Sequence, residues 1–278
     1  DGEDASLYRS LDVHDTADVP DIAVLQSWNE TLRADLYALA ESPRGKPYSG
    51  PVLLSGKAAG VFFHEVFGHR IEGHRQKMED EGKTFGDRIG QRILPANITI
   101  IDDPTVASVD GTDLNGYYTY DDEGVAPTPT TLVENGKFIG FLMGRTPITG
   151  FDQSNGHGRR STGNAPTSRM GNTIVSSTKS APLADLRIML IKEARKQGLE
   201  YGLIVDQIDG GFTTTGRTTP NAFSVRAVKS RRVYVDGRPD QVIRGIDLIG
   251  TPLLAFQDIL ATSTERSVFN GVCGAESG

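Results

Sequence analysis

The feature that most constrains the local fold of this chain is the spacing of two histidines in His64-Glu65-Val66-Phe67-Gly68-His69. Five residues turn an ideal α-helix by about 500°, which would leave the two imidazoles about 140° apart and unable to bind one ion together. A single π-type turn would absorb the additional residue, and Gly68 has no side chain to obstruct it. We therefore expect a helix over residues 57–77 that is distorted, by a π-bulge or otherwise, between Phe67 and Arg70.

Two imidazoles beside a carboxylate are the side chains of a hydrolytic zinc site, and Cys273, the only cysteine in the chain, is a candidate third ligand. Catalytic zinc sites use three protein ligands and keep a fourth position for water. Neutral His64 and His69 with one thiolate would leave one net positive charge, so zinc would remain a Lewis acid. Glu65 is then the candidate general base, which takes a proton from water and passes it to the leaving amine. Taken alone, the motif also fits an ordinary hydrogen-bonded His-Glu pair on a helix.

The composition is that of an ordinary globular chain, because 278 residues with 37% hydrophobic and 23% charged content are enough for a substantial core. The net charge of −7 argues against a nucleic-acid surface, since phosphate binding depends on clustered Lys and Arg. No apolar run approaches the roughly 18 residues that span a bilayer, so no membrane insertion is expected. A cytoplasmic location is expected, although the start at Asp1 without Met also fits a removed N-terminal signal or a preceding domain.

Periodicity and turn residues predict an α+β fold with antiparallel β-rich sheets, a few covering helices, and the histidine-bearing helix packed on a sheet. Helices are expected from Asp21 to just before Pro43, over residues 182–197, and from Thr251 onward. The expected strands include 52–54, 98–101 and 131–134, and the expected hairpin turns are Asn135-Gly136 and Asp236-Gly237. Residues 145–170, rich in Gly, Asn, Ser and Arg, are typical of a functional loop. Residues 1–49 are expected to form an N-terminal extension with one amphipathic helix, and residues 50–278 a second domain.

Five motifs occur in order along the chain: His64-Glu65-Val66-Phe67-Gly68-His69-Arg70-Ile71-Glu72-Gly73, Asp121-Asp122-Glu123-Gly124, Arg169-Met170-Gly171-Asn172-Thr173, Gly210-Gly211 and Gly271-Val272-Cys273-Gly274. With these motifs the chain resembles the TldD/PmbA family, often labelled modulators of DNA gyrase, and specifically its metallopeptidase branch. The resemblance implies that residues 50–278 form a TldD-like catalytic domain. It places the family's metal-binding histidines on His64 and His69, its glutamate on Glu65 and its metal-binding cysteine on Cys273.

The resemblance further implies a zinc-dependent HExxxH peptidase that acts on unfolded or leader-type peptides, bound extended beside a β-strand near the metal. Family members work as homodimers or as heterodimers with another family member, and this chain is similar to the active type of subunit. The alternative is a peptide-binding or scaffolding module with a non-catalytic zinc site, for which a fourth protein ligand would be expected. A hydrolase of another amide or ester is a third reading.

Four further side chains are candidates for supporting roles. Glu72, three positions after His69, could orient that ligand from outside the coordination sphere, or be a helix-surface or capping residue. Arg159, Arg160 and Arg169 are candidates for holding a substrate carboxylate or stabilising an oxyanion, and the alternative is that they tie down the long loop. For the acidic cluster at 121–123 a turn is the better interpretation than a cation site.

Overall fold

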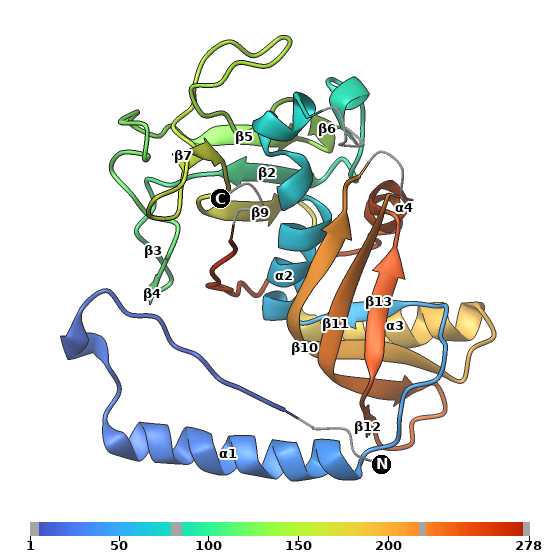
Figure 1. Cartoon of the computed structure of the whole chain (residues 1–278). Helices are drawn as coiled ribbons and strands as arrows, with labels where there is room; N and C mark the ends of the chain where they lie inside the picture. The colour runs from blue at the N-terminus through green and yellow to red at the C-terminus, as the bar shows by residue number, and fades with distance from the viewer. Residues whose placement is uncertain (1–5, 79–84, 217–220, 275–278) are drawn as a thin grey trace.

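The computed structural model describes residues 6–78, 85–216 and 221–274, which form four α-helices, four 3-10 turns and 13 strands (Figure 1). The helices are α1 (Ile22–Glu41), α2 (Gly56–Val66), α3 (Leu183–Lys196) and α4 (Pro252–Gln257). The 3-10 turns are η1 (Thr16–Asp18), η2 (Gly68–Arg70), η3 (Gly73–Gln76) and η4 (Gly86–Arg88). The strands are β1 (Val52–Leu54), β2 (Ile98–Asp102), β3 (Ser108–Val109), β4 (Thr112–Asp113), β5 (Thr130–Glu134), β6 (Lys137–Phe138), β7 (Gly158–Arg159), β8 (Thr167–Ser168), β9 (Thr173–Ser177), β10 (Tyr201–Thr214), β11 (Ala222–Tyr234), β12 (Gln241–Ile243) and β13 (Ile246–Gly250).

The larger sheet is built around the long antiparallel pair β10 and β11. β1 lies parallel to β10, while β12 and β13 both pair antiparallel with β11. Register shifts interrupt the β10–β11 ladder between Val205 and Gly211, which is typical of β-bulges that bend a strand. Beyond Val205, β10 has no partner strand on its β1 side among the described residues.

The second sheet has the order β6-β5-β2-β9 and is antiparallel throughout. Its β5–β6 hairpin turns at Asn135 and Gly136, whose φ angles are 48° and 80°. Two central residues with positive φ are what a type I′ turn requires, and Asn-Gly is its preferred sequence. β9 is an edge strand of this sheet, because β2 is its only partner among the described residues.

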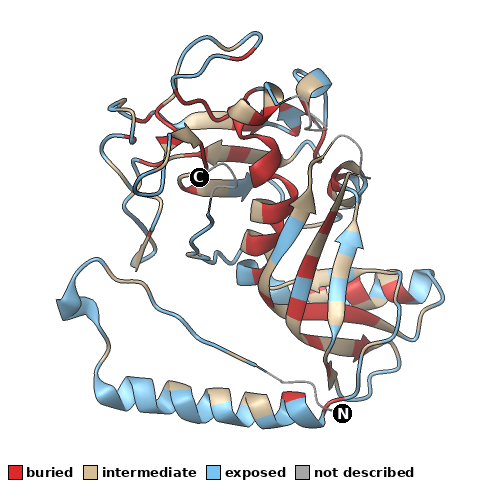
Figure 2. Ribbon diagram, in the orientation of Figure 1, coloured by how far each residue is buried: buried red, intermediate tan, exposed pale blue. Residues whose placement is uncertain are grey.

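Helix α2 lies between the two sheets and buries apolar side chains on more than one side (Figures 1 and 2). Phe62 and Val66 join the core of the four-stranded sheet and α4, where the Phe62 ring meets Phe256 edge-on with centroids 6.2 Å apart. Ala58 and Val61 instead pack against β10 and β11. A helix with apolar residues on several sides is buried, so its C-terminal end is held rigidly inside the fold.

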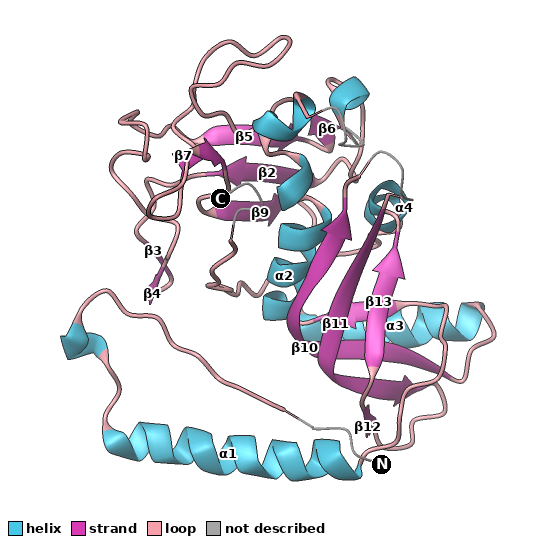
Figure 3. Cartoon of the chain, in the orientation of Figure 1, coloured by secondary structure: helices cyan, strands magenta, loops and turns pink. Residues whose placement is uncertain are grey.

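The N-terminal helix α1 is mostly exposed (Figure 2). Asp21 caps it by accepting from the backbone N–H of Val24 at 3.0 Å, and Leu39 is its only buried residue. An ion pair of 2.7 Å between Asp35 and Lys229 connects it to β11. Figure 3 shows α1 running along one side of the molecule, apart from the sheets.

The predicted α+β class is confirmed, with antiparallel sheets and few helices. The Asp21-capped helix and the Asn135-Gly136 hairpin are also present. One detail is wrong, because the histidine-bearing helix ends at Val66, well before residue 77. The strand at 52–54 is present and partly buried, and the loop at 145–170 contains the short pair β7–β8. No helix in the described ranges is long and apolar enough to cross a membrane. The division at residue 49 remains a prediction, and residues 275–278 of the second predicted domain lie outside the described residues.

Candidate metal centre

The two histidines approach each other because α2 ends between them. The helix stops at Val66, and in turn η2 the backbone N–H of Arg70 donates to the carbonyl of Phe67 at 3.0 Å. The rings of His64 and His69 then lie with centroids 4.8 Å apart and planes at 80°. The expected distortion between Phe67 and Arg70 is therefore present, but the expected π-bulge is wrong, because the backbone tightens into a 3-10 turn instead of widening.

The reason for this tight ending is the buried guanidinium of Arg70. It donates to the carbonyls of Glu65 and Val66, both at 3.1 Å, which lie in the last turn of α2. Carbonyls at a helix end have no intrahelical donor, so this contact caps the helix. The same group donates to the side chain of Asn221 at 3.0 Å and the carbonyl of Ala222 at 3.1 Å, which ties the helix end to β11.

Gly68 is needed for packing and not for a widened turn. A Cβ at this position would lie 2.0 Å from the sulfur of Met170. The absence of a side chain therefore lets the segment at 169–173 approach the histidine turn closely, which places two of the sequence motifs side by side.

Cys273 reaches the histidines on a C-terminal segment that runs along α2. At Gly56 a Cβ would lie 2.3 Å from the Cβ of Ser267, and at Gly60 one would lie 2.9 Å from Phe269. These two glycines, one helical turn apart, allow the segment to lie against the helix. Asn270 fixes the segment further, because its amide donates to the carbonyl of Asp113 at 2.7 Å.

The donor atoms of His64, His69 and Cys273 all lie within 4.8 Å of one another. The sulfur of Cys273 is 3.5 Å from Nε2 of His69. Tetrahedral zinc, with bonds of about 2.3 Å to sulfur and 2.0–2.1 Å to nitrogen, would separate these two atoms by about 3.6 Å. The donor set and its spacing therefore fit zinc, and no fourth His, Cys, Asp or Glu joins this cluster within residues 6–78, 85–216 and 221–274.

The thiol is also biased toward the form that binds metal. Hydrogen bonds to the rings of His64 and His69 lower the pKa of Cys273 to about 5, against the opposing effect of burial. Burial opposes charge on His69, but its hydrogen bonds to Cys273 and Glu72 raise the pKa of His69 to about 9. The metal-free chain thus holds a thiolate beside an imidazolium, and metal binding would displace the ring proton.

Behind His69 lies a fully buried carboxylate, Glu72. Its Oε1 is 3.3 Å from Nδ1 of His69, and its Oε2 accepts from Nε of Arg75 at 2.8 Å. Burial alone would raise the pKa of Glu72, but the hydrogen bond to His69 and the charges of His69, Arg169 and Arg75 lower it. An ionised partner on Nδ1 leaves Nε2 of His69 facing the cysteine, an arrangement common behind metal-binding histidines.

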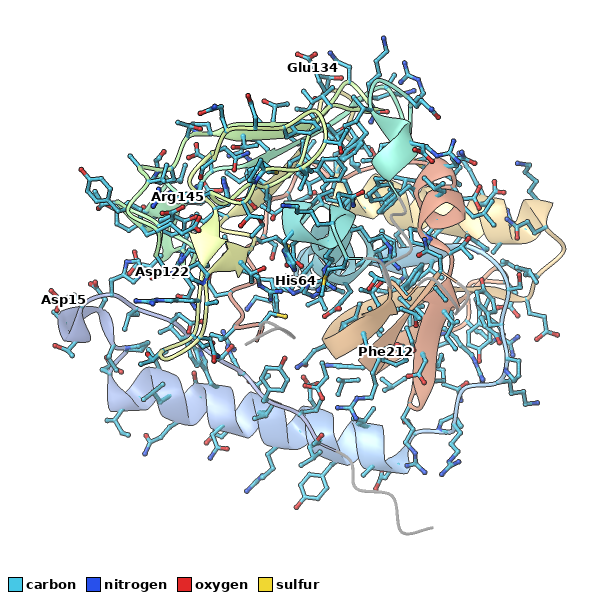
Figure 4. All side chains as sticks on the ribbon, turned by 45° about the horizontal axis from the view of Figure 1, so that its top comes forward. Asp15, His64, Asp122, Glu134, Arg145 and Phe212 are labelled. Carbon is cyan, nitrogen blue, oxygen red and sulfur yellow. The ribbon has the colours of Figure 1, made fainter. Side chains whose placement is uncertain are left out.

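Glu65 lies on the other side of the same imidazole. Its Oε2 is 3.8 Å from Nε2 of His69, the nitrogen that faces Cys273. Its side chain is 10% exposed, so the carboxylate is held close to the donor cluster and still reaches solvent. In Figure 4, His64 lies in the middle of the molecule, between the β10–β11 sheet and the loops that carry Asp122 and Arg145.

The three candidate arginines have different surroundings. Arg169 is buried and contacts Glu72 and the cysteine segment. Arg159 is partly exposed, bonds to Asp122 at 2.9 Å and lies over the ring of Tyr118, so it fastens the loop. Arg160 is exposed and lines the cleft beside the donor cluster.

The acidic motif at 121–124 forms a turn, as the sequence indicated. Asp121 Oδ1 accepts from the backbone N–H groups of Glu123 and Val125, and its Oδ2 from that of Gly158. Asp122 accepts from the backbone N–H of Arg160 at 2.9 Å. These carboxylates are therefore engaged in holding backbone.

The sequence did not reveal a second buried pair, His157 and Asp102, which are both 0% exposed. Nε2 of His157 lies 3.1 Å from Asp102, which also accepts from the backbone N–H of Gly171 and the hydroxyl of Thr173. The carbonyl of His157 accepts from the backbone N–H of Arg169 at 2.9 Å. Because these residues are far apart in the chain, no local pattern could have indicated the pair.

A cleft passes the donor cluster and is lined by His64, Glu65 and Cys273. Strand β9, the bulged part of β10 at Gly210 and Gly211, and the segment at 258–274 are among its other walls. His69 is buried behind the cleft. The arrangement leaves the donor cluster open to a ligand on one side.

The family model of the PmbA/TldA metallopeptidase C-terminal domain matches residues 47–276. The chain belongs to this family. The resemblance seen in the sequence motifs is thereby confirmed, and the family is one of peptidases.

Relatives of this chain are named metalloproteases, a name that implies a metal. One from Methanocaldococcus jannaschii is 29% identical over 253 residues, which cover 91% of this chain and 50% of the relative. One from Methanothermobacter thermautotrophicus is 30% identical over 229 residues, covering 80% and 44%. A metalloprotease TldD homolog of Haemophilus influenzae is 27% identical over 230 residues, covering 81% and 43%. The chain therefore spans about half the length of these relatives, or less.

Solved structures share the fold. TldE from Thermococcus kodakarensis superposes with a TM-score of 0.62 at 21% identity, covering 88% of this chain and 51% of that one. A Thermotoga maritima structure gives 0.63 at 18% identity, covering 90% and 51%.

Proposed function

We propose that this chain carries the catalytic centre of a zinc-dependent peptidase that hydrolyses unfolded or leader-type peptides. The observation that carries the proposal is the donor cluster of His64, His69 and Cys273, within 4.8 Å of one another at an open cleft, with Glu65 beside it. Three donors, as opposed to four, favour a catalytic over a structural zinc site.

In this proposal zinc, held by the two histidines and the cysteine, would supply a Lewis acid that lowers the pKa of water towards about 7. Glu65 accepts the proton of the attacking water and returns it to the leaving amine. Glu72 holds the imidazole of His69 in one orientation.

We further propose that substrate binds as an extended strand. Two strand edges line the cleft: β9, whose only partner among the described residues is β2, and β10 beyond Val205. Backbone pairing with such an edge is largely independent of side chains and suits unfolded peptides. Methylating the peptide nitrogens next to the scissile bond should therefore reduce cleavage more than changing the neighbouring side chains.

Assembly and location also remain proposals. We propose that the chain works as a homodimer or with another family member, in the cytoplasm. The family membership supports the first part, and analytical ultracentrifugation of the chain alone and with a co-expressed relative would test it.

The deciding experiment compares three variants with the wild type. Metal analysis should give about one zinc per wild-type chain, as a three-ligand site requires. Cys273→Ala should lose most of this zinc, because one of three ligands is removed. Glu65→Gln should keep the zinc and lose cleavage of an unfolded peptide by about 10²–10⁴-fold, because an amide cannot accept the proton.

Glu134→Gln is the matched control, because Glu134 is exposed on the turn side of β5 and distant from the cluster in sequence. It should leave zinc content and turnover unchanged. Full turnover by Glu65→Gln would refute its proposed role, whereas a wild type that binds zinc but cleaves no peptide would favour the reading of a scaffolding module with a non-catalytic zinc.

A further inference from the structure

The guanidinium of Arg169 connects the two halves of the donor cluster. Its Nη1 is 2.9 Å from Oε1 of Glu72, the oxygen that faces His69. Its Nη2 donates to the carbonyls of Cys273 and Gly274, both at 3.1 Å. One planar group therefore touches both the carboxylate behind a histidine and the backbone carbonyls of the cysteine and of the residue that follows it.

The cysteine end of this connection has few other attachments. Asn270 anchors the segment to Asp113 and Asn115. From residue 271 to residue 274, the contacts with Arg169 are the only hydrogen bonds from the backbone to the rest of the described fold. The position of Cys273 relative to His69 therefore depends on this guanidinium.

The histidine end is rigid. Glu72 is fully buried, and its other oxygen is held by Arg75. A backbone bridge joins Glu72 to Leu142, with the N–H of Gly73 donating to the Leu142 carbonyl at 2.9 Å. Arg169 thus couples residues 271–274, a segment with few other backbone hydrogen bonds, to the buried carboxylate behind His69.

Arg169 is itself aimed by the buried pair described above. Its backbone N–H donates to the carbonyl of His157, and the next residue but one, Gly171, donates to Asp102. Only 9% of its side chain is exposed. Two of its three nitrogens are engaged with protein groups, so it is poorly placed to bind a substrate carboxylate or an oxyanion.

We propose that Arg169 is a positioning residue that presets the distance between Cys273 and His69 for metal binding. This inference rests on the proposed ligand set of His64, His69 and Cys273. Arginine suits the task because its rigid fork donates in two directions at once, which a lysine ammonium on a flexible stem does not reproduce.

The test uses the whole chain and compares Arg169→Gln and Arg169→Lys with the wild type. The readouts are zinc affinity, by competition with a chromogenic chelator, and the thiolate-to-cobalt charge-transfer band of the cobalt-substituted protein. Arg169→Gln should weaken zinc binding about 10–100-fold, the usual effect of removing a partner that orients a metal ligand. Its charge-transfer band should fall, because the cysteine is no longer held at the cluster.

Arg169→Lys should keep the charge beside Glu72 but lose the bonds to the Cys273 and Gly274 carbonyls. Its zinc affinity should therefore lie between those of the wild type and Arg169→Gln. Arg145→Gln is the matched control, since Arg145 is an exposed arginine of the same loop region. Its affinity and band should equal those of the wild type. Cys273→Ala gives the spectrum without thiolate.

A folded Arg169→Gln protein with wild-type zinc affinity and an undiminished band would overturn the proposal. If that variant does not fold, as judged by circular dichroism, wild-type values in Arg169→Lys would overturn it equally. Failure of the ligand set looks different: the wild type would then lack the band, or Cys273→Ala would retain it. That result would remove the proposed zinc site and the positioning role together.

Discussion

Gly68 and Gly73 lie near the histidines, and replacing either by alanine should cause a steric clash. A Cβ at either position would meet a methionine side chain, but only the one at Gly73 would also meet backbone. In Gly68→Ala the new Cβ would lie 2.0 Å from the sulfur of Met170. Normal carbon contacts are about 3.5–4.0 Å, so the Met170 side chain must move by about 1.5 Å or more. Gly68 does not require a positive φ, and the cost is therefore one of packing alone. Overpacking of this kind costs typically about 1–3 kcal/mol.

Shortening the methionine should remove that cost. In a Met170→Ala background, Gly68→Ala should be close to neutral. The double variant should therefore lose about 1–3 kcal/mol less unfolding free energy than the two single variants lose together. Gly73→Ala is the matched comparison: its Cβ would lie 2.4 Å from the sulfur of Met143 and also 2.7 Å from the carbonyl oxygen of Leu142. Met143→Ala removes only the first clash, so Gly73→Ala should remain destabilising in that background.

Urea unfolding followed by circular dichroism measures the free energies of both double-mutant cycles, Gly68 with Met170 and Gly73 with Met143, provided that the m-values stay constant. The steric explanation is refuted if Gly68→Ala lowers the unfolding free energy equally in the Met170 and the Met170→Ala proteins, to within about 0.5 kcal/mol. It is also refuted if Met143→Ala rescues Gly73→Ala completely, because the backbone clash would then carry no cost.

Three further predictions concern ionisable side chains. In chelator-treated protein, the rate of alkylation of Cys273 should rise with pH and reach half its maximum near pH 5. His69→Ala should move this midpoint towards about pH 8.5, the pKa of a free thiol. The folded chain lowers the pKa of the thiol to about 5 and raises the pKa of His69 to about 9. The unfolding free energy of the metal-free chain should therefore rise from about pH 5 to 6.5, stay level to about pH 8.5 where the two effects cancel, and fall again towards pH 9. A monotonic dependence on pH in urea unfolding would contradict this. His157→Ala should lower the unfolding free energy by about 1.5–3 kcal/mol, because Asp102 loses a charge-assisted hydrogen bond in a buried site, and an effect below about 0.5 kcal/mol would contradict it.

The features that the sequence predicted correctly are those set by neighbouring residues. Asp21 caps α1 through a bond to the third residue of the helix, and Asn135-Gly136 turns through its own positive φ angles. The five-residue spacing of His64 and His69 likewise required a departure from a regular helix. Whether the departure would widen or tighten was not predictable, because it depends on Arg70 and on its partners more than 140 residues away.

The contacts that sequence reasoning missed join residues that are far apart in the chain. Asp102 meets His157 and Gly171, and Arg169 meets carbonyl groups of Cys273 and Gly274. Carbonyls occur at every residue and carry no sequence signal. The sequence therefore assigned Arg169 the same candidate roles as Arg159 and Arg160, although the three have different surroundings in the fold.

The placement of Cys273 shows why the cysteine itself was recognisable and its support was not. With a sequence separation of 204 between His69 and Cys273, closure of this loop is only slightly more costly than that of a loop half as long. What must be fixed is the last stretch, and the fold fixes it through backbone: close approach at Gly56 and Gly60, an Asn270 bond to a carbonyl, and the Arg169 fork. Such contacts hold the chain whatever side chains it carries at Gly271 and Val272, so a thiol at the next position lies beside His69 before any metal arrives. It follows that metal removal should leave the segment in place, and that loss of its backbone contacts should weaken the site even with all three donors intact.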